Sequence, residues 1–395
     1  MGCSTRTTAS TAATDGAAVA ITGALSAGSL AGSTGVTINA VANGTGIGFN
    51  QAANAISSTA GGVTITVNGQ TGTAYYSTGN ITATGQAINI TTTTTTAAGI
   101  NDSGTISGGA VSLTSTQSTS TATLVPISAT GLITANSLTV TGTGGASTTI
   151  VSLGAITINA GGTNIVVTAN NASAGSKIGI TQTGAIINYA VGSSISFISN
   201  NYINQTGAIT LAANTGVTAA NVIYNTTTGT NASSITAGTL TVTNGGTSTA
   251  AINYLVRTNV PGYIRLDNTC SGCATVVTPA NAFLNGAGIS ITGALTAGSF
   301  ANTTGVSINA VANGSGIGFT QGANAISSSA GGVTITVNGQ TGTGYSGSGN
   351  ITATGQAISI TTTTTTAAGI SVTGTISGGV VALSGTQTTS TATAT

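Results

Sequence analysis

The stretch Gly62-Val-Thr-Ile-Thr-Val-Asn-Gly-Gln-Thr71 carries the pattern that decides the fold. Within 63–67 apolar β-branched residues alternate with threonine, so an extended chain places them on opposite faces. Valine, isoleucine and threonine all favour strands. The stretch therefore predicts a half-buried strand with Ile65 facing inward and Thr64 and Thr66 facing solvent.

The same stretch recurs letter for letter at 332–341, inside a much longer duplication. Residues 17–125 match residues 287–395 at a constant offset of 270 without a gap. Roughly three quarters of the aligned positions are identical, and such self-similarity is typical of repeat architectures. We expect the two copies to share one fold and one strand register.

Two of the three acidic residues of the chain are not conserved between the two copies of the repeat. Asp102 is replaced by Val372 in the second copy, and Asp15 by Asn285. This variation favours a surface position for Asp102, where its loss would change stability by less than ~0.5 kcal/mol.

A shorter and less regular period of roughly 20 to 30 residues runs through the long repeat, which is the range of solenoid rungs. Apolar-polar alternation marks it at 19–21, 36–38, 63–67, 88–90, 111–113, 138–140, 156–158, 195–197, 209–211 and 240–242. Gly, Asn and Ser between these runs supply turns. No long window has helical periodicity, so the chain is predicted to be all-β.

The predicted architecture is a parallel β-helix (β-solenoid), with sandwiches and an antiparallel barrel as the weaker options. The inward candidates are mostly Val, Ile, Leu and Ala, which suit the narrow interior of a solenoid better than a sandwich core. In domain terms, 1–16 is a divergent start of the repeat and 17–253 is the first long repeat. Residues 254–286 form an irregular rung or junction, and 287–395 is the partial second copy of 17–125.

Charge is almost absent from this chain of 395 residues: only 2% of residues are charged, and the formal net charge is +1. A disordered chain usually lacks the apolar β-branched residues that recur here, so a folded protein is expected. Such a chain has no field to attract nucleic acid, and no stretch is apolar enough for a membrane span. Residues 1–6 do not resemble a signal peptide, so an export signal is expected outside this sequence.

Cys270-Ser-Gly-Cys273 is the one local motif with possible chemistry. It fits a structural disulfide, inert thiols or a redox pair, whereas a zinc site lacks further ligands because the chain has no His and only Cys3 besides. The segment 254–286 around it is either a projecting binding loop or a looser junction between long repeats. The junction is the favoured interpretation.

No catalytic set is visible, so we predict no enzymatic activity, no cofactor and no metal site. The chain has no His or Glu, and its charged residues lie far apart: Arg6, Asp15, Asp102, Lys177, Arg257, Arg265 and Asp267. Paired carboxylates and a base for a serine nucleophile are therefore missing. The glycine-rich 43–48 lacks the lysine and following helix of a phosphate loop.

The phrases Gly35-Val-Thr-Ile-Asn39 and Gly207-Ala-Ile-Thr-Leu211 carry a family resemblance. They resemble the filamentous haemagglutinin-like exoproteins and autotransporter passenger domains of Gram-negative bacteria. The resemblance implies a right-handed parallel β-helix acting as an adhesin, located outside the cell or on its surface. Its partner would be a host or cell-surface ligand, or further copies of the fibre.

These observations lead to a non-enzymatic structural or adhesive fibre segment as the expected function. The alternative is an ice-binding protein that presents Thr-x-Thr pairs, as at 64/66, 139/141 and 239/241, on a flat face. A regular array needs threonines in register on consecutive rungs. Interruptions at 37/39, 112/114, 157/159 and 194/196 count against it.

Overall fold

The computed structural model consists of two compact units, Met1–Ala190 and Val191–Thr395. In the first unit it describes residues 5–11, 17–27, 35–119, 121–145, 149–171 and 178–189. In the second it describes 194–199, 202–205, 207, 209–211, the strands between 220 and 297, and 306–389 apart from 314, 324, 329 and 330. Every regular element among these residues is a strand.

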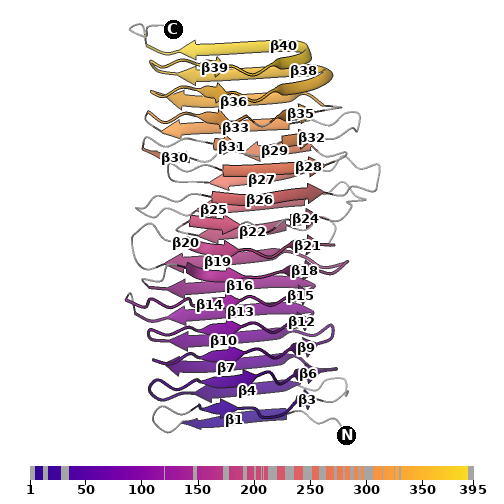
Figure 1. Ribbon diagram of the computed structural model, residues 1–395, viewed down its shortest axis with the longest axis vertical. Coiled ribbons are helices and arrows are strands. Elements are labelled where there is room, and N and C mark those ends of the chain that lie inside the picture. The colour runs from indigo at the N-terminus through magenta and orange to yellow at the C-terminus, as the bar shows by residue number, and fades with distance from the viewer. Residues whose placement is uncertain are drawn as a thin grey trace. The chain divides into compact units, whose positions relative to one another are not determined.

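The first unit is built from three parallel ladders, and Figure 1 shows the strands of each ladder stacked in chain order from indigo to magenta. Ladder A consists of β1 (Thr5–Thr11), β4 (Val36–Val41), β7 (Val63–Gln70), β10 (Ile88–Thr94), β13 (Ala110–Gln117), β16 (Ser137–Gly144) and β19 (Ile165–Asn171). Ladder B consists of β2 (Val19–Ala20), β5 (Phe49–Ala52), β8 (Tyr75–Ser77), β11 (Ile100–Asp102), β14 (Ile127–Ala129), β17 (Thr149–Leu153) and β20 (Ile178–Gln182). Ladder C consists of β3 (Leu25–Ala27), β6 (Ile56–Ser58), β9 (Ile81–Ala83), β12 (Ile106–Gly108), β15 (Ile133–Ala135), β18 (Ile156–Ile158) and β21 (Ile186–Asn188).

Each strand pairs with the strand three places further along the chain, and the pairs are parallel. One strand from each ladder therefore makes one rung, and the chain coils from rung to rung. This confirms the predicted all-β parallel solenoid. A right-handed coil stays an expectation.

The core is made of columns of apolar side chains that stack from rung to rung. In ladder A one column contains Ile38, Ile65, Ile90, Leu113 and Val140, each fully buried and in direct register with the next. Burying one such side chain contributes ~1.5–3 kcal/mol, which offsets much of the ordering entropy of its rung. The predicted inward position of Ile65 is confirmed.

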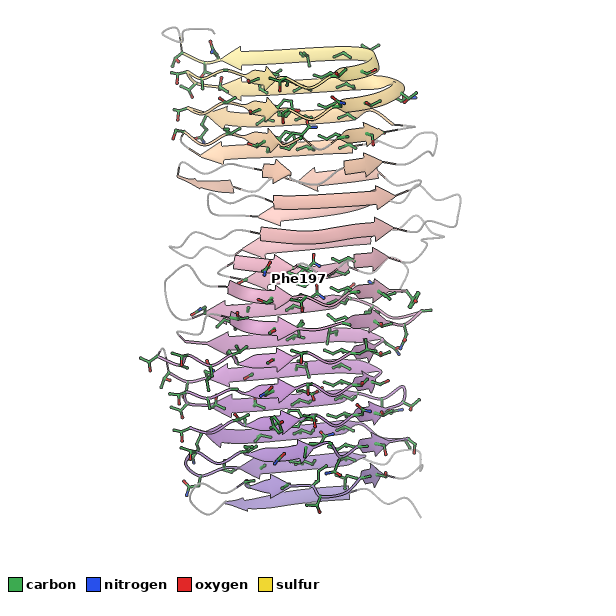
Figure 2. All side chains as sticks on the ribbon, viewed as in Figure 1. Phe197 is labelled. Carbon is green, nitrogen blue, oxygen red and sulfur yellow. The ribbon has the colours of Figure 1, made fainter. Side chains whose placement is uncertain are left out.

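The second unit is also built from parallel ladders, but its strands pair with strands two to four places further along the chain. One of its ladders pairs, in this order, β22 (Ser194–Ser199), β25 (Ala220–Thr226), β27 (Ala251–Arg257), β29 (Ala274–Thr278), β33 (Val306–Asn313), β36 (Val333–Gln340), β38 (Ile351–Thr364) and β40 (Ile376–Gln387). The others are β23 (Tyr202–Gln205), β24 (Ile209–Leu211), β26 (Ile235–Val242), β28 (Ile264–Cys270), β30 (Asn281–Leu284), β32 (Leu295–Ala297) and β35 (Ile326–Ser328). A separate sheet joins β31 (Ile289–Ile291), β34 (Phe319–Gln321), β37 (Tyr345–Gly347) and β39 (Ile370–Val372). Phe197 on β22, labelled in Figure 2, is fully buried.

The two sequence copies adopt the same register in most of the strands described in both, the exception being the end of β5, where Ala52 pairs with Ser77 after a register shift and β34 has Gln321 paired with Gly347 without one. Val36 pairs with Val63 in the first copy, and their counterparts Val306 and Val333 pair in the second. The shift in strand register at the end of β7 recurs at the end of β36. The last residues of the two strands, Gln70 and Gln340, have positive φ values of 46° and 47°. The expected common register is confirmed for these strands.

Candidate functional site

From β7 to β19, the outer side of ladder A carries an uninterrupted column of threonines. The pairing places Thr66 beside Thr91, Thr91 beside Thr114, and so on through Thr141 to Thr168. All five side chains are exposed or half-buried. Neighbouring strands lie about 4.7–4.9 Å apart, so the column repeats its hydroxyl and methyl groups at that spacing.

Two further columns flank this one and widen the face. One runs through Thr37, Thr64, Asn89, Ser112, Thr139 and Val166, and the other through Asn68, Thr93, Thr116, Thr143 and Asn170. We call the three columns together the threonine face. Its residues are uncharged, and all of them except Val166 offer a hydroxyl or amide group.

Part of the same face recurs in the second unit. Thr336 on β36 pairs with Thr361 on β38, which pairs with Ser384 on β40. The hydroxyl column of the first unit thus has a counterpart within the second copy of the repeat.

Chemically, the threonine face suits contact with an ordered or extended surface. Threonine is stiff at χ1, so its hydroxyl and methyl groups are held at little entropic cost. The hydroxyls can donate and accept hydrogen bonds, and the methyls supply apolar contact. Each contact is weak, but a long array adds many of them.

The interior of ladder B holds a polar cluster that the sequence analysis did not predict. Gln51 and Tyr75 are both fully buried, and the Tyr75 hydroxyl donates a hydrogen bond of 2.6 Å to Gln51 Oε1. The Gln51 amide in turn donates to the carbonyl oxygens of Asn54 and Asn80. These bonds satisfy polar groups that would otherwise be costly to bury.

An aromatic stack supports the cluster and is repeated in the second unit. The rings of Phe49 and Tyr75 are stacked at a centroid distance of 5.6 Å, and those of Phe319 and Tyr345 at 5.0 Å. The Tyr345 hydroxyl donates to Gln321, as Tyr75 does to Gln51. Burial raises the pKa of both tyrosines.

The surface position predicted for Asp102 is wrong. Asp102 is only 1% exposed and lies on the inner side of β11, where it pairs with Ser77 and Ala129. Its neighbours on the strand explain this, because alternation in Ile100-Asn101-Asp102 puts Asp102 on the same side as the buried Ile100. Asp102→Val is therefore not a surface change, and the expectation of a negligible effect loses its basis.

The remaining candidate residues of the sequence analysis give no site. Cys270 ends β28, and its side chain and the whole of Cys273 lie outside the described residues, as do Asp15 and Lys177. The side chains of Arg257, Arg265 and Asp267 are also not described; their backbones belong to β27 and β28. The described residues hold no group of three or more potential metal ligands. Over the same part of the chain, no helix is long and apolar enough to cross a membrane.

The fold and its faces define a β-solenoid repeat protein with a hydroxyl-lined surface. Beyond that class, no family model, no curated protein and no solved structure matches the chain.

Proposed function

We propose that this chain is a non-enzymatic structural or adhesive segment of a long repetitive fibre, secreted or displayed on a cell surface. The observation that carries the proposal is the threonine face, which continues from rung to rung without a charge. The resemblance to filamentous haemagglutinin-like exoproteins supports the same class of function.

The solenoid plan suits a fibre because its stability grows with each added rung. Each rung contacts only its neighbours, so length is not limited by a single core. The duplication of 17–125 at 287–395 shows that the sequence itself extends in this way. Solubility then rests on hydroxyl and amide groups rather than on charge.

The binding partner of such a face is a host or cell-surface ligand, or another copy of the fibre. An uncharged face cannot steer a partner over long distances. It holds a partner by many short-range contacts, so binding should depend on several rungs at once and change little with salt.

The central column provides a direct test of adhesion. In the double variant Thr114→Lys/Thr141→Lys we expect binding of the labelled chain to cells, or to further copies of itself, to weaken at least about tenfold, because the lysines break contact across two adjacent rungs. Cell-binding isotherms and sedimentation measure these two modes. The matched control is Ser128→Lys/Ser152→Lys on the outer side of ladder B, where the same two charges are added to paired, half-buried serines.

Two outcomes contradict the proposal. One is a wild-type chain that binds neither cells nor itself at micromolar concentration. The other is equal weakening in the two double variants, which would show that added charge rather than the threonine face determines binding.

Ice binding is the second candidate, and one observation favours it. In ladder A the interruption at Ser112 falls in a flanking column, whereas Asn39 pairs with Thr66 and lies in line with the central column, just before its first threonine. From there Thr66, Thr91, Thr114, Thr141 and Thr168 follow one another in register. A lattice of hydroxyl and methyl groups at strand spacing is the feature that contact with a crystalline surface requires.

An ice-binding face would give thermal hysteresis and shaped ice crystals with the wild-type chain. Both effects should disappear in Thr114→Lys/Thr141→Lys and persist in Ser128→Lys/Ser152→Lys, because only the first pair disturbs the lattice. Nanolitre osmometry measures the hysteresis. A wild-type chain without hysteresis excludes this candidate and leaves the adhesive one in place.

A further inference from the structure

The carboxyl group of Asp102 lies in an interior that does not neutralise it. Oδ1 accepts a hydrogen bond of 3.0 Å from the Gly104 N–H, whereas Oδ2 has no hydrogen-bond partner among the described residues. An ionised carboxylate in such a place is costly, because burial removes water without supplying a cation. Protonation removes that cost.

The strands packed against β11 offer no compensating charge. On β8, Tyr75 faces the same interior and Tyr76 lies on the outer side. On β14 the paired residues Ile127, Ser128 and Ala129 do not titrate. Tyr75 is itself affected: burial, and then the negative charge of Asp102, raise its pKa.

The buried, uncharged surroundings of Asp102 determine the pKa of its carboxyl group. Burial raises the pKa of its carboxyl to about 6, and the Gly104 N–H and the nearby Ser77 hydroxyl only partly oppose the shift. When the rung that contains β11 opens locally and water reaches the carboxyl group, the pKa of Asp102 returns toward its ordinary value near 3.8. Between these values the closed rung holds the proton more tightly than the opened one, so its stability is greatest below pH 4 and falls as the pH rises to about 6.

The second copy of the repeat lacks this group. Val372 replaces Asp102 on β39, and its paired residue is Gly347 where Asp102 has Ser77. The pair formed by Tyr345 and Gln321 is retained. One chain therefore contains two versions of the same strand pair, with and without the carboxyl group. They differ in burial: β11 is paired with both β8 and β14, whereas β39 is paired with β37 on one side, and Ile370 and Val372 are half-buried.

We propose that Asp102 is a proton-operated switch that holds the rung around β11 closed when it is protonated and loosens it when it is ionised. A solenoid allows such local control, because each rung is stabilised mainly by its neighbours and can open without the rest of the chain. Acidic surroundings would stiffen this part of the first unit, and neutral surroundings would soften it.

Native-state hydrogen exchange on the full chain tests the switch. After correction for intrinsic exchange rates, protection of the β8, β11 and β14 amides should fall on the order of 100-fold between pH 4 and pH 7, since each unit of pKa shift is a factor of ten. Amides of β34 and β37 in the second copy should show no such dependence. Asp102→Val, which copies Val372, and the nearly isosteric Asp102→Asn should both abolish the dependence.

A direct titration makes the test independent of any variant. The carboxyl ¹³C shift of Asp102 should titrate with a midpoint near 6. A midpoint near 4 would overturn the proposal. So would equal pH dependence in the two copies, or a dependence that survives in Asp102→Val.

Discussion

Ile65→Asp is expected to lower the free energy of unfolding of the first unit by at least about 4 kcal/mol. Ile65 is fully buried between Ile38 and Ile90 in the core column of ladder A. The change removes a large apolar side chain and places a carboxylate where no cation faces it. Because each rung rests on its neighbours, β4 and β10 should lose stability together with β7.

Denaturant unfolding measures this loss, and Thr66→Asp is the matched control. Thr66 is the next residue on the same strand and is exposed, so the same carboxylate there should change stability by less than ~0.5 kcal/mol. A greater loss from Thr66→Asp than from Ile65→Asp would mean that the inner and outer sides of β7 are reversed. The solenoid interpretation would then fail.

The strands and their inner sides could be predicted because alternation is a local property. Within 63–67 each residue is assigned to a face by its immediate neighbours, and the structure agrees. Duplication then extends the same assignment to 333–337. Neither step needs knowledge of how distant parts of the chain meet.

Register between rungs could not be predicted in the same way. The sequence separation between Thr66, Thr91, Thr114 and Thr141 varies, because the corners between ladders differ in length. When Thr-x-Thr pairs are compared only by their order along the sequence, Asn39 and Ser112 look like interruptions of a threonine array. In the structure Ser112 falls in a flanking column, and Asn39 lies in line with the central one, paired with Thr8 on β1 and Thr66 on β7.

Asp102 shows how a reasonable argument failed. Its replacement by Val372 suggested that the site tolerates change because it is exposed. The stronger signal was local: in a three-residue strand, Asp102 must share the side of Ile100. Val372 at the second site is half-buried and apolar, whereas Asp102 is a buried carboxyl group in a column of otherwise uncharged side chains.

A glycine column was also readable from the sequence but was not recognised. The pattern Gly-x-Ile-Ser/Thr occurs at 79–82, 104–107, 131–134 and 154–157, each time at the start of a ladder C strand. In the structure a Cβ at Gly104 would overlap the carbonyl oxygen of Gly79, and one at Gly131 would overlap that of Gly104. The glycines therefore allow successive rungs to approach at this corner.

Gly104→Ala is consequently expected to destabilise the first unit by about 3 kcal/mol, close to the upper range for overpacking a core. The obstacle is backbone rather than a flexible side chain, so the two rungs must separate and the pairing of β12 with β9 must weaken. Denaturant midpoints give the size of the loss. Hydrogen exchange should place it at β9 and β12.

Gly23→Ala is the control, because a Cβ at Gly23 would meet nothing within 4 Å. The same methyl group should there change stability by less than ~0.5 kcal/mol. Gly131→Ala repeats the test one rung further along and should cost as much as Gly104→Ala, since the same carbonyl contact recurs. If Gly104→Ala and Gly131→Ala both prove as harmless as Gly23→Ala, the rungs cannot approach so closely at this corner, and the Gly-x-Ile-Ser/Thr pattern needs another explanation.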